Sequence, residues 1–280
     1  MPDRTSSQVS PPTVDLALNP FEADLPTLVE VGVAAEQHGV AGLWTADHFS
    51  GAVVDSRWSR DPFVTLGALA LATERVRVGP LVANIRNRHV AQLASAVNSL
   101  ESLAPGRVVL GVGSGAAPGS RFAVEHDAIG TDLGSAEYRR SILRTSISEL
   151  RQLFDVEAED GSDVRGDSLD PLLAVTDGAP CPPIVVGASA RATVDVALDH
   201  ADGINLRHGP KVPELVERAR EARGEAFEVS VLVWHDVDGA VLRGLRDVGV
   251  DRIVVGVLAS HSAVEVTATV DRVRSELAMR

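Results

Sequence analysis

The chain alternates between short apolar segments and longer segments with a helical period. Eight segments are rich in Val, Ile and Leu and lack the polar alternation of a strand with one wet face. They therefore predict strands that are buried on both faces. These segments are 14–18, 41–46, 76–83, 108–112, 183–187, 203–206, 229–234 and 252–257. Such a series of buried strands is typical of an α/β protein with a parallel sheet.

Helical patterns lie between these predicted strands. Apolar residues recur every three or four positions, as in Val90, Leu93, Val97 and Leu100, and again over 143–154. Asp61 before Pro62 predicts a helix N-cap followed by a proline at the first helical position. Gly39 stands where a left-handed residue closes the first helix.

Eight strands, nearly all followed by a helix or a loop, predict a single (β/α)8 TIM barrel, with an open doubly wound sheet as the alternative. Barrels of about 250 residues form one domain. We predict a disordered Ser/Pro-rich tail at 1–13, the barrel at 14–280, and a loop insertion near 156–182 that is rich in acidic residues, Gly and Pro. The loops after the strands would carry the function.

The amino-acid composition excludes some classes of binding partner. The formal net charge is −13, with 39 acidic against 26 basic residues, and aromatic residues make up 4%. Both features argue against nucleic-acid binding. The single Cys181 leaves no intrachain disulfide and no Cys-rich metal site. The longest apolar stretch, 63–72, is far shorter than the roughly 20 residues of a membrane span, and the N-terminus lacks a secretory signal. We expect a soluble cytoplasmic protein with no membrane partner.

The end of the second predicted strand carries a candidate catalytic pair. Asp47 and His48 are adjacent where a barrel strand delivers side chains to the functional face. A histidine there can exchange a proton near neutral pH, and a neighbouring carboxylate can tune it. The alternative is structural: Asp47 caps the loop and His48 bonds to backbone.

Closely spaced glycines end the fourth predicted strand. Together with Ala116, the stretch 111–115 formally fits the dinucleotide pattern G-x-G-x-x-G/A. Because three strands precede it and Pro118 follows at once, it does not open the helix of a Rossmann unit. Gly113, Ser114 and Gly115 either let a flat ligand approach the backbone or allow tight packing at the barrel rim.

Small residues follow the fifth predicted strand and open a helix. Gly187, Ala188 and Ser189 suit a phosphate bound at a helix N-terminus, and Arg207 after the sixth strand would add positive charge. Ordinary capping by Ser189 is the alternative. The segment 234–236, Trp-His-Asp, is either a pocket edge or a surface turn. The remaining histidines lack metal-ligand spacing, so no metal site is predicted.

In this order the motifs resemble the bacterial luciferase-like monooxygenase family and its branch that uses the deazaflavin coenzyme F420. Five phrases carry the resemblance: GLWTADHF, DPFVTLGALALATERVRVG, SLESLAPGRVVLGVGSG, PPIVVGASA and HADGINL. It extends from about Val14 to Leu206. The fold that it implies, a (β/α)8 barrel, agrees with the strand count.

The resemblance also implies roles for individual residues. His48, beside Asp47, would donate or accept the proton that accompanies hydride transfer. A non-proline cis peptide is expected between Leu81 and Val82. The residues expected around the cofactor ring and its side chain are Leu81, Val82, Asn84, Gly113, Ser114 and Gly115, and those expected at its phosphate are Gly187, Ala188, Ser189 and Arg207.

The implied function is hydride transfer between F420 and a small organic substrate. The Asp-His pair and the arginine-rich composition favour F420 over FMN, but an FMN-dependent monooxygenase and a flavin-binding protein without turnover stay open. Ala116 replaces the carboxylate of the glucose-6-phosphate branch and Lys211 is the only lysine, which argues against that substrate. A metal-dependent hydrolase would need ligands such as His-x-His where 16–19 reads Leu-Ala-Leu-Asn. The family resemblance further suggests a homodimer.

Overall fold

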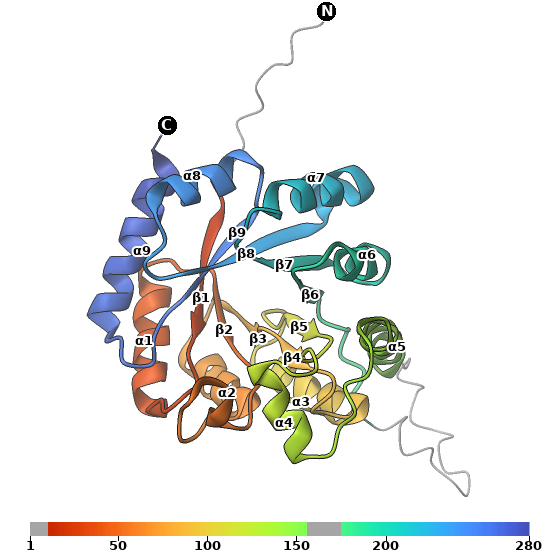
Figure 1. The fold of residues 1–280 in the computed structure, drawn as a ribbon. Coiled ribbons are helices and arrows are strands. Elements are labelled where there is room, and N and C mark those ends of the chain that lie inside the picture. The colour runs from red at the N-terminus through yellow and green to blue at the C-terminus, as the bar shows by residue number, and fades with distance from the viewer. Residues whose placement is uncertain (1–10, 156–174, 280) are drawn as a thin grey trace, which may run out of the picture.

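A computed structural model of the 280-residue chain describes residues 11–155 and 175–279. Nine parallel strands and nine α-helices alternate over this part of the chain (Figure 1). The strands are β1 (Thr13–Leu18), β2 (Gly42–Thr45), β3 (Arg77–Pro80), β4 (Ala83–Asn84), β5 (Leu110–Gly113), β6 (Ile184–Ala188), β7 (Gly203–Arg207), β8 (Glu228–Trp234) and β9 (Arg252–Gly256). The helices are α1 (Leu25–Gln37), α2 (Pro62–Ala72), α3 (Val90–Leu103), α4 (Val124–Ala128), α5 (Ala136–Phe154), α6 (Arg191–His200), α7 (Val212–Arg223), α8 (Gly239–Asp247) and α9 (Ala263–Ala278).

The sheet closes into a barrel. Its strand order is β3-β2-β1-β9-β8-β7-β6-β5-β4, and a parallel bridge between Val78 and Val108 joins β3 to the start of the β5 strand. Because β3 and β4 are two parts of one strand, separated at Leu81 and Val82, the barrel has eight strand positions. The predicted (β/α)8 barrel is therefore confirmed, and so are all eight predicted strands.

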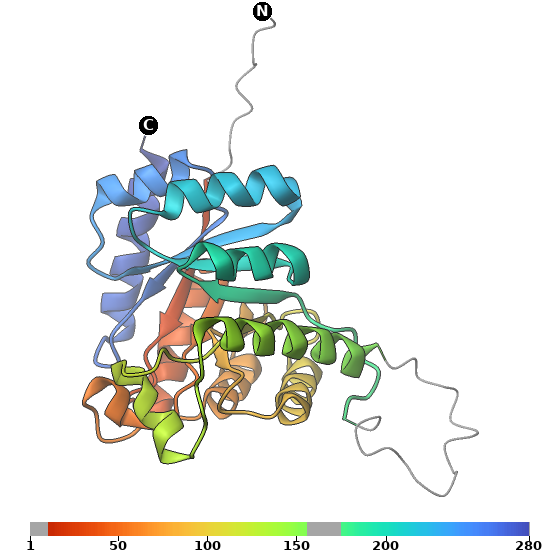
Figure 2. The same cartoon turned by 45° about the vertical axis from the view of Figure 1, so that its right-hand side comes forward.

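Two predicted helix ends, at Asp61 and at Gly39, are confirmed by the structure. The Asp61 side chain accepts hydrogen bonds from the backbone N–H groups of Phe63 and Val64, so it caps α2 as predicted. Gly39 follows α1 with φ +74°, the left-handed conformation expected there. In Figure 2, α5, α6 and α7 lie side by side on the outside of the barrel.

Two of the predicted boundaries, the start of the barrel and the loop insertion, can be compared with the described residues. Strand β1 begins at Thr13, whose N–H bonds to the carbonyl of Asp251, so the barrel starts one residue earlier than expected. Residues 1–10 of the predicted tail and 156–174 of the predicted insertion lie outside the described residues. The described remainder of the insertion, 175–182, contains no helix or strand.

Most buried side chains fill the layer between strands and helices, but the inside of the barrel has two contrasting parts. At mid-height a small apolar cluster contains Trp44, Val109, Val185 and Val254. Nearer the amino ends of the strands lie four charged side chains, called here the charged plug: Asp15, Arg77, Glu228 and Arg252. Asp15 is fully buried. The strands are therefore not apolar on both faces throughout, contrary to the pattern that predicted them.

Both ends of the described chain lie at the amino end of the barrel. β1 enters the sheet there, and α9 runs back antiparallel to the strands, as helices of a β/α barrel do. Among the described residues, no helix is long and apolar enough to cross a membrane.

Candidate functional site

His48 lies in the loop after β2, at the carboxyl end of the barrel. Its Nδ1 is 2.8 Å from Oε2 of Glu125, a fully buried residue of α4. The other oxygen of Glu125 accepts hydrogen bonds of 2.7 Å from the backbone N–H groups of Phe49 and Ser50. One carboxylate therefore holds both the imidazole and the loop that carries it.

These contacts determine the charge on Glu125 and the hydrogen on His48. Burial alone would raise the pKa of Glu125, but the hydrogen bond from His48 and those from the amides of Ser50 and Phe49 hold it below its usual value. An ionised carboxylate only accepts hydrogen bonds, so Nδ1 of His48 carries the hydrogen. The Nε2 atom is then left to exchange a proton, and the side chain keeps 19% of its surface exposed.

Asp47 does not pair with His48. One Asp47 oxygen accepts the backbone N–H of Asn84 at 2.9 Å, and Arg88 approaches both oxygens at 3.1–3.2 Å. Arg88 also bonds to Asp61 at 2.8 Å. The hydrogen-bond partner of His48 is therefore Glu125 rather than the adjacent Asp47, and the catalytic role expected of Asp47 stays a prediction. Asp47 instead fixes the strand that follows the break between β3 and β4.

That break is a non-proline cis peptide between Leu81 and Val82, as expected. The Val82 side chain packs against two of the predicted glycines: an added Cβ at Gly113 would collide with Val82 Cγ2, and one at Gly187 would lie 2.8 Å from Cγ1. The contact at Gly113 agrees with the tight-packing alternative, Gly187 packs in the same way, and the ligand contacts of both glycines stay a prediction. Leu81 and Val82 are only partly buried, so they leave an apolar surface at the barrel mouth.

Asn84, which lies beside Gly115, is hydrogen-bonded to a histidine that the sequence did not single out. The Asn84 Oδ1 accepts the N–H of Arg86 at 3.0 Å, and its Nδ2 lies 3.2 Å from Nε2 of the fully buried His126. Burial lowers the pKa of His126, which keeps its ring neutral and able to accept that bond. Gly115 has φ +81°, and an added Cβ would lie 2.7 Å from Arg86 Cγ.

The predicted phosphate corner is at the ends of β6 and β7. Ser189 is exposed and does not cap α6; the N-cap residue is Ala190, without a side-chain hydrogen bond to the helix. The capping alternative for Ser189 is therefore wrong. Arg207 is exposed at the end of β7 and lines a cavity of about 300 Å³ together with His208 and Trp234. Trp234 lies with its ring against Gly256, so it borders a pocket as well as a turn.

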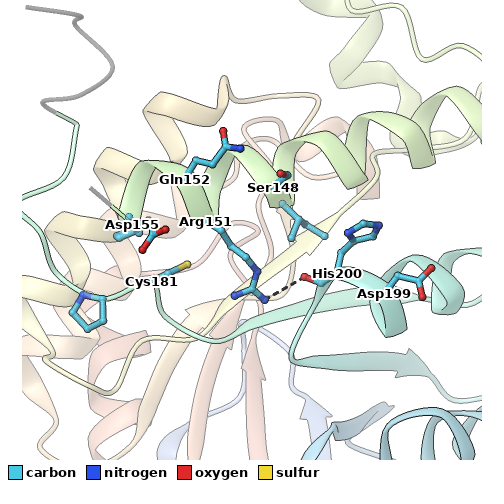
Figure 3. Close-up of a pocket in the computed structure, with 10 residues that line it drawn as sticks. Ser148, Arg151, Gln152, Asp155, Cys181, Asp199 and His200 are labelled. Carbon is cyan, nitrogen blue, oxygen red and sulfur yellow. Dashed lines mark hydrogen bonds between the residues drawn. The ribbon is translucent and has the colours of Figure 1, made fainter. Parts of the chain in front are cut away.

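The larger cavity is elsewhere. A volume of about 610 Å³ lies between α5, the end of α6 and the segment before β6 (Figure 3). Arg151 bonds to the His200 carbonyl there, and burial raises the pKa of the Cys181 thiol to about 11, which leaves it unreactive. The cavity opens near the amino ends of the strands, so it is separate from His48. Among the described residues no cluster of three or more metal-ligating side chains occurs.

The sequence reasoning missed Glu125, Arg88 and His126. Glu125 and His126 are neighbours in the short motif Glu-His-Asp, the one signal that was available. The remaining predicted cofactor residues, Ser114 and Ala188, lie at the same end of the barrel, and their ligand contacts stay a prediction.

The matching family model is described as luciferase-like monooxygenase and matches residues 4–233. The chain belongs to the luciferase-like monooxygenase family. The family resemblance seen in the sequence is thereby confirmed.

Curated relatives within this family include F420-dependent enzymes. A 5,10-methylenetetrahydromethanopterin reductase of Methanolobus tindarius is 28% identical over 235 residues, 79% of this chain and 65% of the relative. An F420-dependent glucose-6-phosphate dehydrogenase of Nakamurella multipartita is 30% identical, covering 67% of this chain and 53% of the relative. The chain thus spans less than two thirds of the length of these relatives.

A solved structure supports the fold. An F420-dependent secondary alcohol dehydrogenase in complex with an F420–acetone adduct superposes with a TM-score of 0.75, covering 96% of this chain and all of that chain. At 16% identity, this likeness shows the shared barrel alone.

Proposed function

We propose that this luciferase-like protein transfers a hydride between coenzyme F420 and a small organic substrate, with His48 exchanging the accompanying proton. The observation that carries the proposal is the His48–Glu125 pair, which leaves Nε2 of a partly exposed imidazole at the barrel mouth. The glucose-6-phosphate dehydrogenase and the secondary alcohol dehydrogenase described above have F420 in their names, which supports the choice of cofactor.

The residues at the mouth fit a flat ring that carries a phosphate. Leu81 and Val82 provide a partly exposed apolar surface for the ring. The start of α6 has no side-chain cap, so its amides and the exposed Ser189 suit a phosphate, with Arg207 as a nearby charge. The proposed cofactor residues are Leu81, Val82, Asn84, Gly113, Ser114 and Gly115 at the ring, and Gly187, Ala188, Ser189 and Arg207 at the phosphate.

Bound F420 would supply the carbon that takes or gives the hydride. The protein's own part is proton transfer and positioning. His48 Nε2 takes the proton when the substrate is oxidised and returns it in the reverse direction. Glu125 stabilises the imidazolium that forms, because its buried carboxylate lies 2.8 Å from Nδ1. Asp47 and Arg88 hold the backbone at Asn84.

Parallel titrations of the purified protein with F420 and with FMN, followed by fluorescence, test the proposal. We expect selective binding of F420 and its reduction or reoxidation with a suitable substrate. Selective binding of FMN would overturn the cofactor assignment in favour of an FMN-dependent monooxygenase. Binding of F420 without turnover of any substrate would instead indicate a binding protein.

A homodimer is a further part of the proposal, supported by α2. This helix contains no charged residue, and Val64, Ala68 and Leu71 share one face by their helical spacing. Val64 is 65% and Leu71 72% exposed, so the face is apolar and uncovered within one chain. We expect sedimentation velocity to show a dimer that the Val64→Glu, Leu71→Glu double variant shifts toward monomer. A monomeric parent protein would contradict the proposal.

A further inference from the structure

We infer that the substrate is uncharged and carries an apolar body, an aromatic ring or an alkyl chain of several carbons, seated against the phenylalanines around His48. The inference rests on the proposed function, whose substrate class it names. For an alcohol of this kind, the carbinol carbon would give a hydride to the bound cofactor, the hydroxyl would give its proton to His48 Nε2, and a C=O bond would form. The alcohol is oxidised and the cofactor is reduced.

Aromatic residues are scarce in the chain but gather at this histidine. Six Phe, three Trp and one Tyr occur in 280 residues. The ring centroids of Phe21 and Phe122 lie 5.5 and 5.7 Å from that of His48. Phe49, the next residue in the chain, is 48% exposed. These three rings come from the loops after β5, β1 and β2, so three separate segments converge to give His48 apolar surroundings.

Three charged groups near His48, those of Glu125, Asp47 and Arg88, already have partners. Glu125 bonds to His48 and to two backbone amides, and Asp47 bonds to Arg88 and to the Asn84 amide. The Arg88 guanidinium is shared between Asp47 and Asp61. A phosphate or carboxylate on the substrate would therefore have to break an existing ion pair or lie without one, and an unpaired buried charge is strongly disfavoured.

A further cation beside these rings, Arg121, could attract an anionic substrate. Its guanidinium lies over the Phe122 ring, 4.8 Å from the centroid, and the residue is exposed. The planar Arg121 guanidinium enlarges the flat surface of the Phe122 ring, and an uncharged aromatic substrate can also stack on that surface. The Arg121→Ala variant therefore separates binding of an anionic substrate from binding of an uncharged one.

The first measurement is F420 binding by fluorescence, which judges the proposed function by itself. With the F420-loaded enzyme, KM is then compared for 2-butanol, 2-hexanol, 4-phenyl-2-butanol and glucose 6-phosphate. We expect KM to fall about fourfold for each buried methylene and to be lowest for the phenyl compound. A constant KM along the alcohols, or a preference for glucose 6-phosphate that Arg121→Ala abolishes, would overturn the inference.

Saturation-transfer NMR gives a readout that does not depend on turnover. We expect 4-phenyl-2-butanone to receive magnetisation from the protein with and without F420, and Phe122→Ala and Phe49→Ala to weaken that transfer at least threefold. Phe49→Leu should restore most of it, and Val264→Ala, an exposed apolar change on α9, should leave it unchanged. Equal transfer in Phe122→Ala, Phe49→Ala and Val264→Ala would contradict the inference even if F420 binds.

Discussion

The two ends of the barrel both bury charged side chains, but they connect them differently. At the amino end, Asp15 accepts from Trp44 and Arg252 at 2.9 Å, while Glu228 accepts from Arg252 at 2.8 Å and from Arg77. Each carboxylate of the charged plug therefore finds its donors inside the barrel. At the carboxyl end, Glu125 is equally enclosed, but its partner His48 keeps one ring nitrogen free of partners among the described residues.

The comparison shows that burial and the groups that contact a carboxylate act in opposite directions on its pKa, and that the balance differs between the two ends. Burial raises the pKa of Asp15, and the opposing effects of Arg252 and Trp44 do not cancel it. Burial also acts on Glu125, but His48 and two amides outweigh it and its pKa is lowered. A closed network of this kind stabilises the fold, whereas an open one can pass a proton to a ligand.

The largest effect expected is at the plug. Arg252→Ala leaves Asp15 without its cation and should lower the free energy of unfolding by about 3–5 kcal/mol, since a buried charge loses its partner. Urea denaturation measures this loss. Arg144→Ala on α5 removes an exposed partner of Glu137 and should cost less than about 1 kcal/mol. Equal losses of unfolding free energy in the two variants would contradict a larger stabilising effect of the buried ion pairs in the charged plug.

The next largest effect is expected on turnover, at His48 in the carboxyl end of the barrel. His48→Ala should reduce turnover about 100-fold or more, because general acid–base catalysis of this type contributes about that much. F420 affinity, measured by fluorescence titration, should change little. A parallel loss of affinity would show that His48 holds the cofactor rather than the proton.

Removing the negative charge beside His48 should have a smaller effect. Glu125→Gln keeps the shape of the side chain but no longer stabilises an imidazolium, so turnover should fall about tenfold. The loss should fall mainly on kcat rather than on KM, because the buried carboxylate acts on the charge that develops on the imidazole during proton transfer. Unchanged turnover would mean that Glu125 only holds the loop at Phe49 and Ser50.

The smallest effect expected is a change in acid sensitivity. Burial would raise the pKa of Glu228, but Arg252 and Arg77 hold it below its usual 4.5. Its stabilising contribution is therefore present above pH 4.5 and is lost as the pH falls through the lowered pKa. Glu228→Gln should be less stable at pH 7 and should lose less stability between pH 7 and acid pH, as followed by urea denaturation. An unchanged pH slope would contradict this assignment.

Sequence patterns predicted the structural features that depend on residues close together in the chain. Apolar segments predicted all the strands, and Asp61 and Gly39 predicted helix boundaries, because strand burial and capping are local properties. The cis peptide at Leu81 and Val82 followed from the family resemblance. In contrast, Glu125 reaches His48 across 77 residues from the five-residue helix α4, and no local pattern encodes such a pair.

Two further differences arise from the geometry of the barrel. Asp47 was expected beside His48 because they are adjacent, but its carboxylate bonds to Asn84 and Arg88 instead. The charged plug joins residues as far apart as Asp15 and Arg252, which become neighbours only when β1 pairs with β9. A purely apolar expectation for the strands could not foresee it.

The shared location of the chain ends has a practical consequence. The described chain enters β1 and leaves α9 at the amino end of the barrel, while His48 opens at the other end. Attaching the protein to a sensor chip or fusing it to a cofactor-recycling enzyme through either end would therefore leave the mouth facing the solution. Substrates could then be screened on immobilised protein.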